Sequence, residues 1–361
     1  MDRSAKVKAL SGRMEEQEVD RVVLFSRDNV MYFTGFRLNR AASSILVVTS
    51  AGEPTYVVAQ LDLERARRDC WVEQVISFPE DTPNYLDALG PLLAGSRRLG
   101  VERSCLTLAQ ADYLRALVGP QLDLVDVEPW VAEMRLRKDQ QELELIRTAA
   151  AIADRAMEEF LREVSPGTSE EEAVGMIEYL LRREGSEGAS FEPFVMSGEN
   201  GWLPQRVGSP KPLRSGELIL LDMGARYQGY CSDLTRTFAL GDVSRKQRQA
   251  FAVARQAQQA ALAAARPGVR ADEVDRAARQ LIEEAGLGPY FPHLTGHGVG
   301  VSIHEPPTLD QGVDTLLEPG MVVTVEPGVY VPGVGAARVE DLVVITEDGC
   351  RLLSTARRDL T

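Results

Sequence analysis

The chain has 361 residues, of which 44% are hydrophobic and 26% charged, so its composition is that of a globular protein and neither that of a disordered chain nor that of a membrane protein. Its 40 lysines and arginines stand against 54 aspartates and glutamates, and the net charge of -14 argues against nucleic acid as a partner. The four cysteines are widely spaced, which disfavours a disulfide framework and a zinc-thiolate site. No apolar run has the length of a secretory leader or a membrane span, so we expect a cytoplasmic protein without membrane contact.

The first part of the chain alternates short β-branched runs with helical stretches. Residues 22–25, 43–50 and 54–59 have the composition of strands, and residues 107–119 have the apolar spacing of an amphipathic helix. This alternation predicts a small α/β domain over residues 1–130.

A charged helical tract begins near residue 131, with apolar residues recurring at every third or fourth position. The change in composition predicts a domain boundary at about residue 130. The second domain would then span residues 131–361.

The second domain contains a faint internal repeat. Residues 165–185 align without gaps to residues 266–286, and each copy has a Pro-Gly turn, a helix that opens with acidic residues, and a glycine at its end. Two unrelated helices with common end signals would give the same match. A true repeat would make the domain two related α/β halves that face each other across a cleft.

Two aspartates lie at the ends of neighbouring strand-like segments. Asp222 ends the apolar run LILLD, and Asp233 opens the run DLTRTFAL, with a glycine-containing turn between them. A hairpin of these strands would bring the two carboxylates side by side. Turn and cap residues at the ends of a hairpin are the alternative explanation.

Two glutamates and all three histidines of the chain follow in the C-terminal part. Glu326 and Glu340 each interrupt a β-branched run, where an exposed edge position is the alternative to a functional one. His293, His297 and His304 lie within twelve residues of one another in a glycine-rich segment. Their concentration beside embedded carboxylates indicates a functional site.

Four carboxylates and an imidazole are suited to divalent cations, and their charge is balanced by two ions. Two neighbouring divalent metal ions of this kind activate water and polarise carbonyls in aminopeptidases and phosphatases. We expect two divalent metal ions, Mn²⁺ first, with Co²⁺ or Zn²⁺ compatible with the same ligands.

These segments resemble the motif blocks of the M24 metallopeptidases, the pita-bread family of methionine aminopeptidase, aminopeptidase P and prolidase. The blocks are DMGARYQGYCSDLTRTF at 222–238, TGHGVGVSIHEPP at 295–307, VEPGVY at 325–330 and ARVEDLVVIT at 337–346. Residues 30–58 resemble the creatinase/prolidase N-terminal domain. The resemblance covers nearly the whole chain and implies an α/β fold in which this small domain precedes a pita-bread α+β domain with a pseudo-twofold repeat.

Within the family, the two-domain layout is similar to that of short Xaa-Pro dipeptidases and of aminopeptidase P. It implies metal-dependent hydrolysis of the Xaa-Pro bond in a peptide with proline at its second position. A dipeptidase is slightly favoured over an aminopeptidase P that acts on longer peptides. A homodimer is also implied by the resemblance.

The resemblance assigns five metal ligands, which are Asp222, Asp233, His297, Glu326 and Glu340. Asp222 and Asp233 would hold one ion, Asp233 and Glu340 would bridge to the second, and His297 and Glu326 would complete it.

The resemblance also assigns residues around the metals. Glu326 would help to move protons, and His304 would hydrogen-bond the substrate carbonyl. His293 would lie beside the leaving proline, and Arg338 would support the ligands and the substrate. A strand-edge salt bridge is the alternative for Arg338.

One position departs from the family pattern. Gln205 stands where the family usually has a histidine, and glutamine forms hydrogen bonds but does not titrate. Gln205 is therefore expected to alter substrate preference or the pH profile.

Arg37 and Arg40 are candidates to bind the substrate carboxylate, with solvated surface arginines as the alternative. Two other functions stay open at this point. A non-catalytic peptide-binding member of the fold would hold no metal, and a phosphoesterase would need more basic residues than Arg236 and Arg338 near the ligands.

Overall fold

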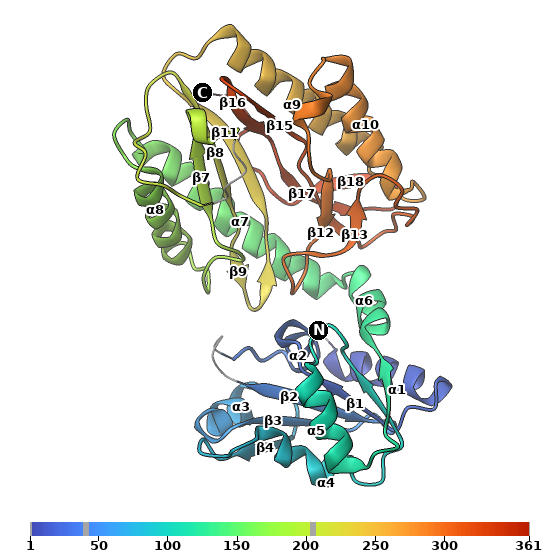
Figure 1. The fold of residues 1–361 in the computed structure, drawn as a ribbon. Helices are drawn as coiled ribbons and strands as arrows, with labels where there is room; N and C mark the ends of the chain where they lie inside the picture. Colours follow the sequence, from blue (N-terminus) through green and yellow to red (C-terminus); the bar gives the residue numbers. More distant parts are fainter. Residues whose placement is uncertain (1, 39–42, 203–206, 361) are drawn as a thin grey trace. The chain divides into compact units, whose positions relative to one another are not determined.

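The computed structural model describes residues 2–38, 43–202 and 207–360. The chain divides into two compact units, residues 1–135 and residues 136–361, each of which we describe by itself (Figure 1). None of the helices in these described ranges combines the length and the apolar character needed to cross a bilayer.

The first unit is built on a six-stranded sheet with the strand order β4-β3-β2-β1-β5-β6. Its strands are β1 (Arg21–Leu24), β2 (Ser44–Thr49), β3 (Pro54–Ala59), β4 (Gln74–Phe78), β5 (Arg98–Val101) and β6 (Asp123–Asp126). Its helices are α1 (Arg3–Glu16), α2 (Arg27–Thr34), α3 (Leu63–Asp69), α4 (Gly90–Leu93), α5 (Leu108–Val118) and α6 (Glu128–Leu136). The strands predicted near residues 22–25, 43–50 and 54–59 and the helix predicted at 107–119 are confirmed to within a few residues.

Helix α5 shows why the helix prediction succeeded. Thr107 accepts a hydrogen bond from the backbone of Gln110, and the Gln110 side chain accepts one from the backbone of Thr107. This capping box satisfies backbone donors that would otherwise lack partners at the start of the helix. Leu114 of the same helix is fully buried and packs with Leu99 of β5 in the core of the unit.

The second unit contains two pairs of helices and the strands between them. The helices are α7 (Gln140–Glu163), α8 (Glu170–Arg183), α9 (Arg245–Ala264) and α10 (Ala271–Glu284). The strands are β7 (Phe194–Ser197), β8 (Glu217–Met223), β9 (Arg226–Tyr227), β10 (Tyr230–Cys231), β11 (Leu234–Leu240), β12 (Gly296–Gly298), β13 (Glu305–Leu309), β14 (Val322–Val325), β15 (Gly328–Val331), β16 (Gly335–Arg338), β17 (Asp341–Ile345) and β18 (Cys350–Leu352). Sheet β11-β8-β7 belongs to the first pair of helices and sheet β13-β12-β14-β17-β18 to the second.

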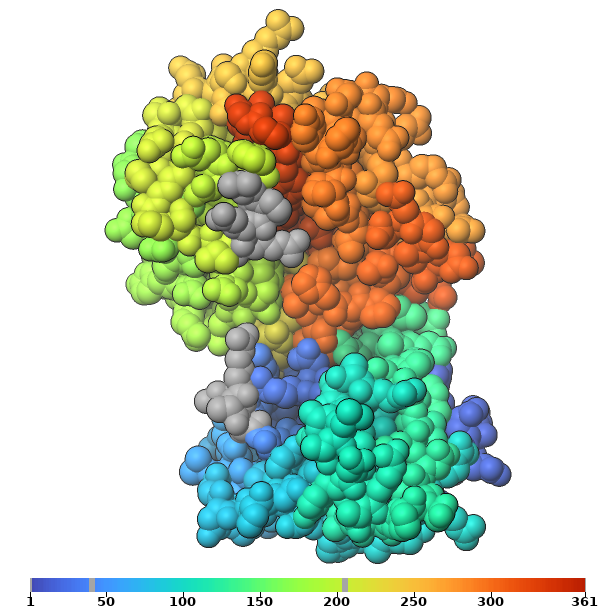
Figure 2. All heavy atoms as spheres, viewed as in Figure 1, coloured from blue at the N-terminus to red at the C-terminus, as the bar shows by residue number. Residues whose placement is uncertain are grey.

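The internal repeat is confirmed by hydrogen bonds made at corresponding positions. Before α8, the backbone N–H of Gly167 donates to Leu213 over 2.9 Å; before α10, that of Gly268 donates to Leu317 over 2.8 Å. Both glycines have positive φ, 97° and 79°, a conformation that favours glycine. The two helices therefore begin with the same turn, next to an isolated β-bridge at the corresponding position of each half. The two halves form opposite sides of the unit, green to yellow and orange to red in Figure 2.

Each half has its own apolar core. In the first half, Ile177 of α8 packs with Leu221 of β8; in the second, Ala278 of α10 packs with Val323 of β14. The charged helical tract predicted from residue 131 comprises the end of α6 and the whole of α7, which begins after the capping box of Asp139.

Two hairpins meet between the halves and carry the four carboxylates singled out in the sequence, Asp222, Asp233, Glu326 and Glu340. Strands β8 and β11 pair antiparallel, with the short β9-β10 hairpin at their turn. In the second hairpin β15 pairs with β16, and β14 pairs with β17. Strand β16 packs against β8 and β11, so the two hairpins lie face to face.

Candidate metal centre

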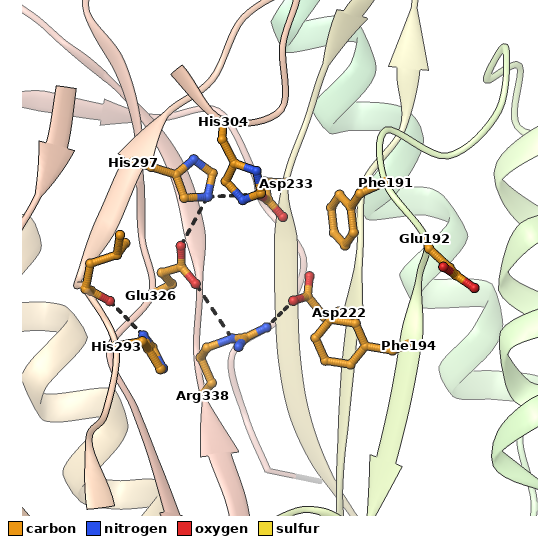
Figure 3. Close-up of a pocket in the computed structure, with 11 residues that line it drawn as sticks. Phe191, Glu192, Phe194, Asp222, Asp233, His293, His297, His304, Glu326 and Arg338 are labelled. Carbon is orange, nitrogen blue, oxygen red and sulfur yellow. Dashed lines mark hydrogen bonds and ion pairs between the residues drawn. The ribbon is translucent and has the colours of Figure 1, made fainter. Parts of the chain in front are cut away.

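A pocket of about 560 Å³ opens between the two halves of the second unit. Side chains from both halves point into it (Figure 3). It is lined by Phe191, Glu192, Phe194, Asp222, Asp233, His293, Leu294, His297, His304, Glu326 and Arg338. All three histidines and three of the four carboxylates singled out in the sequence lie here, although they come from widely separated segments.

The predicted β8-β11 hairpin is confirmed and positions the two aspartates. Asp222 lies near the end of β8, directly across from Thr235, and Asp233 immediately precedes β11. Both carboxylates are largely buried, with residue exposures of 8% and 5%. Burial of two acidic groups so close together is costly unless cations or donors compensate it.

The two glutamates lie where the second hairpin bends. Glu326 separates β14 from β15, and Glu340 separates β16 from β17, so neither continues a regular strand as the sequence pattern predicted. At these breaks both side chains turn toward the aspartates. Glu340 is only 1% exposed, which rules out the exposed edge position considered for it.

His297 lies on β12 between two of the carboxylates. Its Nε2 is 3.4 Å from Asp233 Oδ2 and 3.3 Å from Glu326 Oε1, while its Nδ1 lies 3.0 Å from the carbonyl oxygen of Gly298. Gly296, the residue before His297, lets β12 lie close to β14, because a Cβ at this position would be 2.0 Å from the carbonyl oxygen of Thr324. The imidazole is thus held with Nε2 toward the acidic groups.

Asp233, His297 and Glu340 fit a metal ion by position. One ligand atom from each lies within 4.8 Å of the others, and all three residues are buried. Glu340 Oε1 is buried, and no group in the described part of the chain donates a hydrogen bond to it. Such an oxygen is stabilised by a cation.

The pKa values of these groups indicate the same need for positive charge. Burial raises the pKa of Asp233. Burial and the charges of Asp233, Glu326 and Asp222 raise the pKa of Glu340 well above its usual value. Although burial opposes its charged form, His297 has a pKa well above the usual value because Asp233 and Glu326 surround it. Without a cation, protons supply the charge that the cluster requires.

Glu326 differs from its neighbours. Burial would raise its pKa, but the hydrogen bond and charge of His297, together with Arg338, lower it to about 2. Thr324 donates a hydrogen bond to Glu326 Oε1 over 3.0 Å. Glu326 is therefore held as a carboxylate that accepts hydrogen bonds.

Arg338 joins the ligands to the pocket wall. Its guanidinium forms an ion pair with Asp222 and donates a hydrogen bond to the hydroxyl of Tyr330 over 2.8 Å. That hydroxyl lies 3.0 Å from His293 Nε2, and His293 Nδ1 lies 2.7 Å from the carbonyl oxygen of Leu294. At 3% exposure, Arg338 is no strand-edge surface residue.

His304 lies against His297, with the ring centroids 4.3 Å apart and the planes tilted by 60°. It follows β12 in a loop and lines the pocket.

Of the remaining predicted residues, Arg37 lies in the first unit after α2 and is half-buried. Arg40 and Gln205 lie outside the described residues.

Several residues of this region were not predicted from the sequence. Phe191 and Phe194 form an apolar wall opposite the histidines (Figure 3). Tyr330 and Thr235 contact Arg338. The aromatic residues of FEPF at 191–194 were an available signal, whereas a threonine in a strand has no distinguishing pattern.

Models of two protein families match most of the chain. The metallopeptidase family M24 matches residues 144–347, and the creatinase/prolidase N-terminal domain matches residues 6–137. The two matches follow the order of the two units of the structure.

Relatives cover both units. A Xaa-Pro dipeptidase of Pyrococcus furiosus is 34% identical over 96% of this chain and 97% of its own. The crystal structure of a prolidase from Pyrococcus horikoshii superposes with a TM-score of 0.92 at 34% identity, covering 99% of this chain and 100% of that one. An X-Pro aminopeptidase from Thermotoga maritima has a TM-score of 0.86 at 29% identity and covers 96% of this chain and 99% of its own.

Proposed function

Because this chain belongs to the metallopeptidase family M24, we propose that it hydrolyses the bond between an N-terminal residue and proline, as a Xaa-Pro dipeptidase. The family implies divalent metal ions. The observation that carries the proposal is the buried group of Asp233, His297 and Glu340, of which Asp233 and His297 line a pocket of about 560 Å³. A cavity of this size accommodates a dipeptide and encloses most of its surface.

We assign the metal ligands as the resemblance suggests. Asp222 and Asp233 would hold one ion, Asp233 and Glu340 would contact both, and His297 and Glu326 would complete the second. When bound, the two ions would polarise the scissile carbonyl and supply a water nucleophile at neutral pH. This set, within the proposed catalytic domain of residues 131–361, also explains why so many acidic groups are buried together.

The chain's own residues orient the peptide and move protons. We assign to His304, which lines the pocket beside His297, a hydrogen bond to the substrate carbonyl. To Glu326 we assign the transfer of a proton to the leaving nitrogen. His293, in contact with Tyr330, would line the side of the leaving proline.

The finer features of the proposal concern metal, assembly and location. Mn²⁺ is the metal that we propose, and Co²⁺ or Zn²⁺ suit the same ligands. A homodimer and a cytoplasmic location complete the proposal. None of the four cysteines, all of which lie in the described ranges, forms a disulfide, which supports a reducing compartment.

Aminopeptidase P is the second candidate, supported by the aminopeptidase from Thermotoga maritima. The test compares proline release from a Xaa-Pro dipeptide with cleavage of a longer Xaa-Pro-Xaa peptide, using metal-stripped protein with and without Mn²⁺. We expect metal-dependent cleavage of the dipeptide alone. Cleavage of the longer peptide would identify an aminopeptidase P. Protein that neither holds metal nor gains hydrolysis from added Mn²⁺ would favour a non-catalytic peptide-binding protein, and metal binding without either cleavage would mean a different substrate or a lost activity.

Substrate contacts by Gln205, Arg37 and Arg40 form a separate part of the proposal. A Gln205→His variant should show a changed pH profile or a changed preference among Xaa-Pro peptides, because histidine titrates and glutamine does not. Unchanged values of both would contradict the role of Gln205.

A further inference from the structure

Thr235 lies between two of the charged groups that the metal centre requires. It is the second residue of β11, is fully buried, and pairs across the strands with Asp222. Its backbone carbonyl accepts a hydrogen bond from the N–H of Glu340 over 3.2 Å. The residue therefore contacts the metal-ligand hairpins through both its backbone and its side chain.

The hydroxyl of Thr235 has all of its hydrogen-bonding capacity in use. It accepts from Arg338 Nε over 3.0 Å and from a terminal nitrogen of the same guanidinium over 2.8 Å. Because a guanidinium only donates, the single hydroxyl proton must go to the third neighbour, Glu340 Oε2, at 2.6 Å. The direction of every hydrogen bond in the group is thereby determined.

This arrangement distinguishes the two oxygens of Glu340. Oε2 accepts the hydrogen bond of Thr235, while Oε1 is the buried oxygen to which no group in the described ranges donates. The hydroxyl thus fixes the rotation of the carboxylate and leaves Oε1 available as a ligand. Through Arg338, which also pairs with Asp222, the same hydroxyl connects ligands of the two hairpins.

Thr237, two residues further along β11, binds the backbone of Arg338 through its hydroxyl. Thr237 donates from its hydroxyl to the Arg338 carbonyl oxygen over 2.9 Å and accepts from the Arg338 N–H over 3.0 Å. Thr237 therefore fixes the main chain of β16, and Thr235 fixes the side chains of Arg338 and Glu340.

We propose that Thr235 is a positioning residue that sets the affinity of the centre for its metal ions by orienting Glu340 and Arg338. The inference rests on the metal-binding part of the proposed function. Groups that hydrogen-bond metal ligands in this manner typically affect metal affinity by about 10–100-fold.

The test is Mn²⁺ binding to metal-stripped full-length protein, measured by titration calorimetry without any peptide. Thr235→Val keeps the shape of the side chain and removes the hydroxyl, and we expect its affinity to fall by about 10–100-fold. Thr235→Ser keeps the hydroxyl and should bind with nearly the affinity of the unmodified protein. Thr55→Val, a buried change in β3 of the other unit, is the matched control and should leave the affinity unchanged.

A purely structural role would give a different result. Thr235→Val would then lower the melting temperature of the metal-free protein while its Mn²⁺ affinity stayed normal, which would overturn the proposal. If the valine variant does not fold, the comparison of Thr235→Ala with Thr235→Ser decides between the same outcomes. Absence of Mn²⁺ binding by the unmodified protein would overturn the metal centre itself, whereas binding without peptide cleavage would overturn only the peptidase assignment.

Discussion

At the scale of single residues, the buried carboxyl of Glu340 lowers the stability of the metal-free fold while it serves as a proposed metal ligand. Burial and neighbouring carboxylates raise the pKa of Glu340 well above its usual value. As the pH rises through the ordinary carboxyl range, the unfolded chain loses this proton while the folded metal-free protein keeps it. The metal-free fold therefore loses stability as the pH rises toward the raised pKa.

Replacement of the Glu340 carboxylate tests whether it destabilises the metal-free protein and contributes to metal binding. In Glu340→Gln, the metal-free protein should melt at pH 8 at the same temperature as the unmodified protein or higher, because no charge is buried. The gain in melting temperature on addition of Mn²⁺ should shrink, and peptidase activity should fall by more than the roughly 100-fold typical of losing a ligand's hydrogen-bonding partner. A lower melting temperature of the metal-free variant, measured by calorimetry, would contradict this account of Glu340.

The residues of the pocket that the sequence predicted are mainly the charged ones. Carboxylates and imidazoles inside apolar runs are unusual, and the pattern of residue types alone therefore indicated Asp222, Asp233 and His297. Thr235 and Tyr330 could not be found in this way, because both residue types are common in strands. Their roles depend on partners such as Glu340, which is 105 positions from Thr235 in the sequence.

At the scale of elements, the repeat predicts that substitutions at its two Pro-Gly turns change the free energy of unfolding by equal amounts. Gly167 and Gly268 have positive φ, and a Cβ at either position would meet no atom within 4 Å. Substitution of either by alanine should therefore cost only backbone strain, about 1–2 kcal/mol in the free energy of unfolding. Gly175→Ala is the control, since this glycine lies inside α8 with the same open space and should gain up to about 1 kcal/mol. Unequal losses at the two turns, measured by urea unfolding, would show that the halves are not equivalent there.

A buried ion pair holds the start of β13 next to His304. Lys138 Nζ lies 2.7 Å from Glu305 Oε1, and the two side chains are 2% and 4% exposed. Lys138→Met should lower the free energy of unfolding by roughly 3–5 kcal/mol, because the Glu305 carboxylate stays buried without this charge. Lys138→Met combined with Glu305→Gln should recover part of the loss. An additive double variant in denaturant titrations would mean that the two residues do not act as a pair.

The elements themselves were largely predictable where local signals decide them. The β8-β11 hairpin and the paired turns of the repeat followed from strand composition and Pro-Gly punctuation. The breaks at Glu326 and Glu340 were not predicted. Pro327 and Gly328 directly after Glu326 were a local signal for the first break that the prediction did not use, whereas no proline or glycine adjoins Glu340 at the second. The bend comes from packing of β16 against β8 and β11, which is long-range in sequence.

At the scale of the whole molecule, the chain consists of two units with separate cores. Leu99 is fully buried in the core of residues 1–135, and Leu180 is fully buried in that of residues 136–361. Every carboxylate and histidine of the candidate metal centre belongs to the second unit. A unit with its own core can unfold by itself, so metal binding should stabilise only one of the two.

Scanning calorimetry of the full chain tests this separation. We expect two transitions, of which only one moves up on addition of Mn²⁺, by an amount equivalent to about 2.7 kcal/mol at a free metal concentration of 100 times Kd. Leu99→Ala should lower the transition that Mn²⁺ does not move, and Leu180→Ala the one that it does, each by roughly 2–5 kcal/mol. A single transition that both variants and Mn²⁺ shift would mean that the two cores unfold together. In that case metal bound in the second unit would also stabilise the first, because ligand binding stabilises every part of a cooperative unit equally.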